Sequence, residues 1–128
     1  MAMATIRDVM SKVMVTVGPS ATIAEAATVM GARHVGSALV VEGDDLKGIF
    51  TERDILRALA SDFDAAHHLV SDWMTKDPAT ITPDAPVAEA LDRMLEEGFR
   101  HLPVMEGGAL VGIVSLRDLS RAGSVRDD

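Results

Sequence analysis

Apolar residues fall at helical spacing in two stretches of the chain, residues 23–30 and 87–94. In each stretch they recur three and four positions apart, the pattern of a helix with one buried face. The first stretch is preceded by Thr22, which with Glu25 forms a Thr-x-x-Glu sequence that can cap free backbone N–H groups. The second stretch follows Pro86, a residue that suits the first turn of a helix. We therefore predict two helices whose apolar stripes belong to the core.

Two pairs of apolar runs follow these helices, and each pair predicts a β-hairpin. The first pair, SALVVE at 37–42 and LKGIF at 46–50, flanks a Gly-Asp-Asp sequence. The second pair, HLPVME at 101–106 and ALVGIV at 109–114, flanks Gly-Gly. Glycine and aspartate supply the backbone conformations that tight hairpin turns require. We expect each hairpin to contribute two strands to a sheet.

Shorter elements complete the same order in both halves. Apolar runs at 13–17 (VMVTV) and 79–81 (ATI) predict a brief strand ahead of each first helix. A second, short helix is expected after each hairpin, TERDILRALA from Thr51 and SLRDLSRA from Ser115. Each half therefore has the order strand, helix, strand, strand, helix.

The two halves are copies of one unit. The sequence GIFTERD at 48–54 returns as GIVSLRD at 112–118, a shift of 112 − 48 = 64 positions, and this shift aligns the halves without a gap. Such self-similarity indicates an internal repeat. A repeat of about 55 residues buries little surface alone, so we expect both to pack as one module. The predicted boundaries are repeat 1 at 5–58, a linker at 59–68, repeat 2 at 69–122 and a tail at 123–128.

Composition narrows the function. The 128 residues are 48% hydrophobic and 25% charged, as in globular proteins, and carry a formal charge of −8, which argues against a general nucleic-acid binder. The absence of cysteine excludes disulfides, thiolate zinc sites and thiol nucleophiles. The N-terminal residues show no secretory signal and no apolar run reaches the length of a membrane span, so we expect a cytoplasmic protein that does not enter a membrane.

The repeated hydroxyl–aspartate pairs, Thr51 with Asp54 and Ser115 with Asp118, are the main candidates for chemistry. A Thr-x-x-Asp sequence can simply cap a helix. A carboxylate can also accept hydrogen bonds from both hydroxyls of a ribose, and a hydroxyl at a helix start can meet a phosphate oxygen. Because the pair repeats in register after the same Gly-Ile strand, both interpretations stay open. No nucleophile–base pair or phosphate-binding glycine loop is present, so we do not expect an enzyme.

Several sequences together resemble the CBS-domain family, named after cystathionine β-synthase. They are DVMSK and DWMTK at the repeat starts, ATIAEAATVM and APVAEALDRM on the first helices, GFRHLPV before a hairpin, and GIFTERD and GIVSLRD after the hairpins. The tandem pair is similar to a complete CBS module, or Bateman module. The resemblance implies an α/β (α+β) fold of two β-α-β-β-α repeats packed with pseudo-two-fold symmetry. One departure is Leu39 in repeat 1, where repeat 2 has the family's proline, Pro103.

The resemblance also implies which residues bind a ligand. Each of the family's clefts takes a hydroxyl and an aspartate from one repeat and strand-edge groups from the other, with short strands offering backbone to adenine. In repeat 1 the residues so implied are Val15, Thr16, Val17, His34, Val35, Gly36, Ser37, Ala38, Thr51, Arg53 and Asp54. In repeat 2 they are Ala79, Thr80, Ile81, Phe99, Arg100, His101, Leu102, Ser115, Arg117 and Asp118. His34 and His101 can equally be structural, and Arg53 and Arg117 can equally face solvent.

By the same resemblance we expect a regulatory module that binds an adenosine-containing ligand, such as AMP, ADP, ATP, NAD or S-adenosylmethionine. It would signal to a separate regulated protein, form a homodimer, and require no cofactor and no metal. The alternative is a structural dimerisation module whose clefts are non-functional. The adjacent residues His67 and His68 are expected to be solvated linker residues rather than metal ligands, because neighbours on a helix do not share one face.

Overall fold

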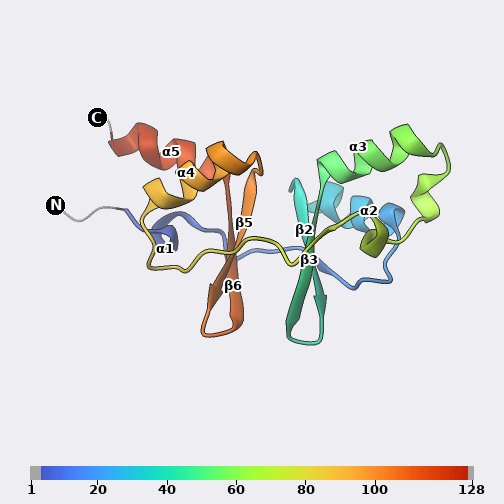
Figure 1. Cartoon of the computed structure of the whole chain (residues 1–128), viewed down its shortest axis with the longest axis horizontal. Helices are drawn as coiled ribbons and strands as arrows, with labels where there is room; N and C mark the ends of the chain where they lie inside the picture. Colours follow the sequence, from blue (N-terminus) through green and yellow to red (C-terminus); the bar gives the residue numbers. More distant parts are fainter. Residues whose placement is uncertain (1–3, 127–128) are drawn as a thin grey trace. The chain divides into compact units, whose positions relative to one another are not determined.

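A computed structural model describes residues 4–126, with side chains described up to residue 121 (Figure 1). The chain divides into two compact units, each a mixed α/β structure. Residues 14–78 form unit 2, and unit 1 combines residues 79–126 with residues 4–13. The α/β class predicted from the sequence is confirmed.

Unit 2 is built on a four-stranded sheet in the order β1-β2-β3-β4. Strand β1 lies parallel to β2, and the other neighbours are antiparallel. The strands are β1 (Thr16–Val17), β2 (Ser37–Glu42), β3 (Asp45–Thr51) and β4 (Thr75–Lys76). The helices are α2 (Ile23–Arg33) and α3 (Glu52–Ser61), followed by the 3-10 helices η1 (Ala65–His67) and η2 (Val70–Asp72). Thr22 and Glu25 form the expected capping box at the start of α2.

Unit 1 repeats this plan around a two-stranded hairpin. It contains α1 (Ile6–Val9), α4 (Val87–Glu97), β5 (His101–Glu106), β6 (Ala109–Ser115) and α5 (Leu116–Arg126). Isolated bridges extend the hairpin on both sides, Ile81 pairing with Val104 and Ser11 with Ile113. The run at 79–81 is therefore a single bridge rather than a strand, and the run at 13–17 is a strand only at Thr16–Val17.

The compact units do not coincide with the sequence repeats, because the first residues of each repeat pack in the unit of the other. Thr75, near the start of repeat 2, pairs with Ile49 of repeat 1. Ser11, near the start of repeat 1, pairs with Ile113 of repeat 2. Both pairs are related by the same shift of 64 positions, so the exchange is symmetric in sequence.

Two glycines permit the close approach of these exchanged segments. A Cβ added at Gly48 would lie 2.6 Å from Sδ of Met74 and 2.7 Å from the backbone oxygen of Thr75. A Cβ added at Gly112 would lie 2.8 Å from Sδ of Met10 and 2.9 Å from the backbone oxygen of Ser11. Real Cβ atoms do not approach other atoms so closely. The glycine of each Gly-Ile strand is thus explained by packing rather than by ligand binding.

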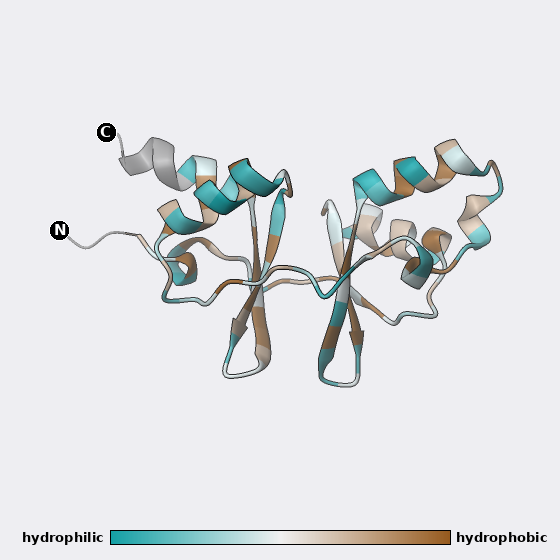
Figure 2. Cartoon of the chain, in the orientation of Figure 1, coloured by the Kyte–Doolittle hydropathy of each residue, from teal (hydrophilic) through white to brown (hydrophobic). Residues whose placement is uncertain are grey.

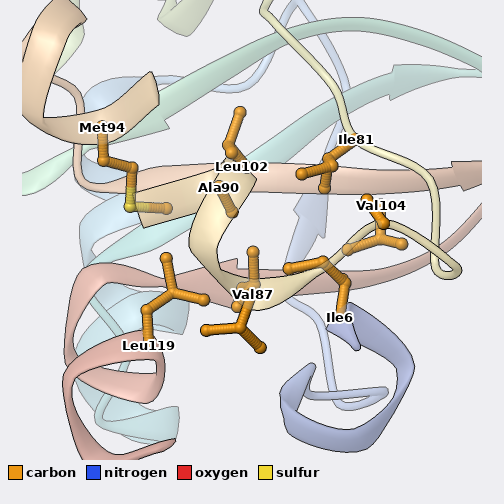
Figure 3. Packing of buried hydrophobic residues seen from close by; sticks show 10 residues of the cluster. Ile6, Ile81, Val87, Ala90, Met94, Leu102, Val104 and Leu119 are labelled. Atoms are coloured by element: carbon orange, nitrogen blue, oxygen red, sulfur yellow. The ribbon is translucent and has the colours of Figure 1, made fainter. Parts of the chain in front are cut away.

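Each unit has its own apolar core. In unit 1 the side chains of Ile6, Val87, Met94, Leu102 and Leu119 converge from α1, α4, α5 and the hairpin (Figure 3). In unit 2 Phe50 is the largest fully buried side chain. Figure 2 shows hydrophobic residues along the strands of both hairpins and a mixture of both kinds on the helices. The stripes predicted at 23–30 and 87–94 supply the buried faces of α2 and α4.

Candidate functional site

Asp54 is a buried carboxylate at the start of α3 whose two oxygens have different partners. Its Oδ2 accepts hydrogen bonds from the backbone N–H of Thr51 at 3.0 Å and from the Thr51 hydroxyl at 3.3 Å. Its Oδ1 accepts a hydrogen bond from Nη1 of Arg57 at 2.8 Å. The residue is only 5% exposed, although the Arg57 side chain is 57% exposed. The helix-capping role of Asp54 is therefore realised, and one further partner, Arg57, was not expected.

Asp118 occupies the equivalent position at the start of α5. Its Oδ2 accepts from the backbone N–H of Ser115 at 3.0 Å, and its own backbone N–H donates to the Ser115 hydroxyl oxygen at 3.1 Å. Arg121 lies three residues further on, as Arg57 does after Asp54, but among the described side chains no ion pair joins Arg121 to Asp118. The carboxylates thus share a capping role and differ at the second oxygen.

The helix starts are also fixed to the entry of the first hairpin strand in each unit. The backbone N–H of Glu52 donates to the oxygen of Gly36 at 3.1 Å, and that of Leu116 donates to the oxygen of Arg100 at 2.8 Å. In the strand pairing, Ser37 lies opposite Thr51 and His101 opposite Ser115. The predicted strand-entry residues and hydroxyl–aspartate pair of one repeat therefore lie close together within one unit.

The predicted ligand residues form one group in each unit. Unit 2 holds Val15, Thr16, Val17, His34, Val35, Gly36, Ser37, Ala38, Thr51, Arg53 and Asp54, and unit 1 holds Ala79, Thr80, Ile81, Phe99, Arg100, His101, Leu102, Ser115, Arg117 and Asp118. We call these groups the Asp54 half-site and the Asp118 half-site. The pairing of residues from both repeats in one cleft, which the resemblance implied, stays a prediction.

Four of these residues can offer a ligand little but backbone. The side chains of Val15, Ala38, Ile81 and Leu102 are buried in the unit cores. The N–H of Ile81 donates to the Pro103 oxygen, and its own oxygen accepts from the N–H of Met105. Thr80 presents its oxygen to Nη1 of Arg93 at 2.8 Å. Backbone groups of Thr80 and Ile81 that were predicted to contact adenine are thus already hydrogen-bonded within the protein.

The two predicted histidines occupy different structural positions. His34 is exposed and ends α2 in the left-handed region, with φ 56°. The equivalent residue after α4 is Gly98, with φ 83°, a conformation that glycine adopts without strain. His101 is half-buried at the start of β5. His34 therefore has a helix-terminating role, which leaves its side chain available to solvent.

The predicted arginines Arg53, Arg100 and Arg117 are all exposed. Among the side chains that the structure describes, no ion pair holds any of them. Arg53 and Arg117 each come directly before the aspartate of their half-site. Their positive charge is therefore available near the carboxylates and helix N-termini, where a phosphate would need it.

Sequence reasoning missed a polar network beside Asp54. The guanidinium of Arg57 lies 5.6 Å from the ring centroid of Trp73, a cation–π distance. The indole N–H of Trp73 donates to Nδ1 of His68 at 3.0 Å, and Nε2 of His68 lies 2.8 Å from Oδ2 of Asp62. His68 is therefore a fixed, half-buried residue, and the prediction of a solvated linker residue is wrong for it.

Among the side chains that the structure describes, up to residue 121, no three His, Asp or Glu residues gather as a metal site would require. Within residues 4–126 no helix is both long and apolar enough to cross a bilayer. Asp62 belongs to the polar network instead: the backbone N–H of Asp64 and, second, the hydrogen bond with His68 hold its pKa below the ordinary value.

Comparisons with known proteins agree with these elements. The model of the CBS domain matches residues 6–61 and 70–124. The CBS domain-containing protein YhcV of Bacillus subtilis is 38% identical, with 92% of this chain and 84% of that protein covered. A 17.7 kDa protein of Acidianus ambivalens is 48% identical over 83% of this chain, which spans 65% of that relative's length.

Solved structures show the same fold. The CBS-domain protein ATU1752 from Agrobacterium tumefaciens is 35% identical, with a TM-score of 0.89 over 94% of this chain and 95% of that one. The CBS domain pair of protein MJ0100, solved with 5'-methylthioadenosine and S-adenosyl-L-methionine, is 27% identical, with a TM-score of 0.88 over 98% and 99% of the two chains. The chain therefore belongs to the CBS-domain family, and its two repeats form a CBS domain pair.

Proposed function

We propose that this CBS pair is a regulatory module that binds an adenosine-containing ligand and signals to a separate protein. The observation that carries the proposal is the repeated placement of a carboxylate and a hydroxyl at a helix N-terminus, in Asp54 with Thr51 and in Asp118 with Ser115. A ribose diol and a phosphate each find a matching group there. The complex of MJ0100 with two adenosine-containing molecules supports this ligand class.

The ligand is AMP, ADP, ATP, NAD or S-adenosylmethionine, bound without a further cofactor or metal and without catalysis. The half-sites offer hydroxyls, carboxylates and exposed arginines, which can bind a nucleotide but provide no activated nucleophile. Isothermal titration of the pure protein with each ligand tests the proposal. We expect at least one to bind, and Asp54→Asn combined with Asp118→Asn to weaken that ligand by ten-fold or more, since each carboxylate bond contributes about 1.5–3 kcal/mol. Binding that survives both substitutions unchanged would contradict it.

A second candidate is a structural dimerisation module with non-functional clefts, and one observation favours dimerisation. Leu56 and Leu59 lie at helical spacing on α3, and Phe63 follows just past the end of that helix; the three residues are 69%, 46% and 93% exposed. Exposed apolar stripes of this kind usually mark interfaces. We propose a cytoplasmic homodimer that uses this stripe, whether or not a nucleotide binds. Light scattering of the wild type and of Leu56→Lys tests it, with a dimer expected only for the wild type.

A further inference from the structure

The two repeats carry matching arginines with different surroundings. Arg57 and Arg121 are related by the shift of 64 positions, and each lies three residues after the aspartate of its half-site. Arg57 donates to Oδ1 of Asp54 at 2.8 Å. Arg121 makes no ion pair with Asp118 among the described residues. Something outside the helix itself must therefore hold Arg57 in place.

The exchanged segments explain the difference. Trp73 reaches unit 2 because the start of repeat 2 packs there, and its ring lies 5.6 Å from the Arg57 guanidinium. The equivalent residue in unit 1 is Val9, which packs against the apolar core and offers no aromatic face to a cation. Among the described side chains, the cation–π contact therefore exists beside Asp54 and not beside Asp118.

A second difference fixes the tryptophan. Since the Trp73 indole N–H donates to Nδ1 of His68, that nitrogen is an acceptor, and a neutral His68 carries its proton on Nε2. This Nε2–H then donates to Oδ2 of Asp62 at 2.8 Å. The position equivalent to His68 in unit 1 is Ala4, which cannot take part in such a chain. Trp73 thus has two partners, His68 through a hydrogen bond and Arg57 through a cation–π contact.

The two carboxylates differ in how many hydrogen-bond acceptor positions remain for a ligand. A carboxylate has about four acceptor positions. Asp54 uses two on Oδ2 for Thr51 and one on Oδ1 for Arg57. A ribose diol needs two, so it must displace Arg57 from Oδ1 if the helix cap that Thr51 forms on Oδ2 is to stay intact. Asp118 uses one position for the Ser115 backbone and is not engaged by Arg121, so both ribose hydroxyls can bind without displacement.

On the basis of the proposed function, we propose that Arg57 and Trp73 are positioning residues that make the two half-sites unequal. Arg57 competes with the ribose for Oδ1 of Asp54, and Trp73 keeps it there. The Asp118 half-site therefore binds an adenine nucleotide first. Binding at Asp54 releases Arg57 from its carboxylate and changes the environment of Trp73, the one tryptophan of the chain.

The test isolates each half-site with AMP as the probe. Asp118→Asn leaves the Asp54 half-site, and Asp54→Asn leaves the Asp118 half-site. In the Asp118→Asn protein, adding Arg57→Gln should tighten AMP binding about three- to ten-fold. The ligand then no longer has to break a partly exposed ion pair and a cation–π contact, which together correspond to about that factor in affinity. In the Asp54→Asn protein, the matched control Arg121→Gln should leave the affinity unchanged.

Tryptophan fluorescence gives a readout that a purely structural role would not move. AMP should alter Trp73 emission in the Asp118→Asn protein and leave it unaltered once Arg57→Gln is added. Unchanged or weaker binding after Arg57→Gln overturns the inference, as does an Asp118→Asn protein that binds no AMP with or without that substitution while Asp54→Asn binds it. If the wild type binds none of the adenosine ligands, the proposed function fails and the inference fails with it.

Discussion

Replacing Gly48 by alanine places a methyl group where β4 pairs with β3 in unit 2. The new Cβ would lie 2.6 Å from Sδ of Met74 and 2.7 Å from the oxygen of Thr75. The Met74 side chain can change rotamer, but the Thr75 oxygen belongs to the backbone of β4. This strand pairs with β3 at two positions, Gly48 with Lys76 and Ile49 with Thr75. Relief of the clash therefore requires β4 to move away from the sheet.

Overpacking in a closely packed region costs about 1–3 kcal/mol, and a backbone neighbour places Gly48→Ala toward the upper end. With a urea m-value of about 2 kcal/mol/M, the unfolding midpoint should fall by about 1 M. Unfolding is followed by far-UV circular dichroism and by the fluorescence of Trp73, which directly precedes Met74. The two probes together show whether β4 detaches before the rest of the unit unfolds.

Gly18→Ala is the matched control, because no atom lies within 4 Å of its added Cβ. We expect its midpoint to equal that of the wild type within experimental error. A double variant, Gly48→Ala with Met74→Ala, should recover part of the loss, since it removes the sulfur and leaves the Thr75 oxygen. If Gly48→Ala is as stable as Gly18→Ala, the close approach of β4 described here is refuted.

Four further substitutions test the packing and the charges. Phe50→Ala should lower the free energy of unfolding by about 3–5 kcal/mol, because Phe50 is fully buried in unit 2, whereas Phe63→Ala, at 93% exposure, should change it by less than about 0.5 kcal/mol in urea titrations. Gly31→Ala should raise it by about 0.5–1 kcal/mol in the same assay, because Gly31 lies inside α2 with open space around it; a loss would contradict this. The folded-state pKa of Asp62 is lowered, so its carboxylate stabilises the fold above the unfolded pKa, and this contribution disappears as the pH falls through the folded pKa. Asp62→Asn should therefore destabilise the protein at pH 7 and have little effect at about pH 2, and a loss of equal size at both pH values would contradict this dependence on hydrogen bonds to the ionised carboxylate.

The helices and hairpins were predictable because neighbouring residues determine each of them. Thr22 and Glu25 indicated the start of α2, glycine-containing turns indicated both hairpins, and the periodic stripes indicated the buried helix faces. The three-residue spacing from Thr51 to Asp54 and from Ser115 to Asp118 also indicated helix capping as one of two possible roles. Each of these features depends on residues within a few positions of one another, so a short stretch of sequence shows all the residues that form it.

The exchange of segments was not predictable for a reason inherent in a repeat. Met10 and Met74 occupy the same position in the two copies, so a contact with Gly48 fits either of them equally well in sequence. The Arg57–Trp73 contact depends on the same choice, because Trp73 belongs to repeat 2 and Arg57 to repeat 1. Only the three-dimensional fold distinguishes the two arrangements.

The exchanged segments also determine how ligand binding at Asp54 can affect residues outside unit 2. Trp73 stands six residues (79 − 73) before Ala79, where the chain enters unit 1, and β4 lies between them. Displacing Arg57 therefore acts on a residue near one of the two places where the chain passes from one unit to the other. In unit 1 the position equivalent to Trp73 is Val9, an apolar residue. Among the described side chains, no arginine contact joins Val9 to Asp118, so a ligand at Asp118 has no equivalent route. We therefore expect Asp118 to anchor the ligand and Asp54 to report its presence.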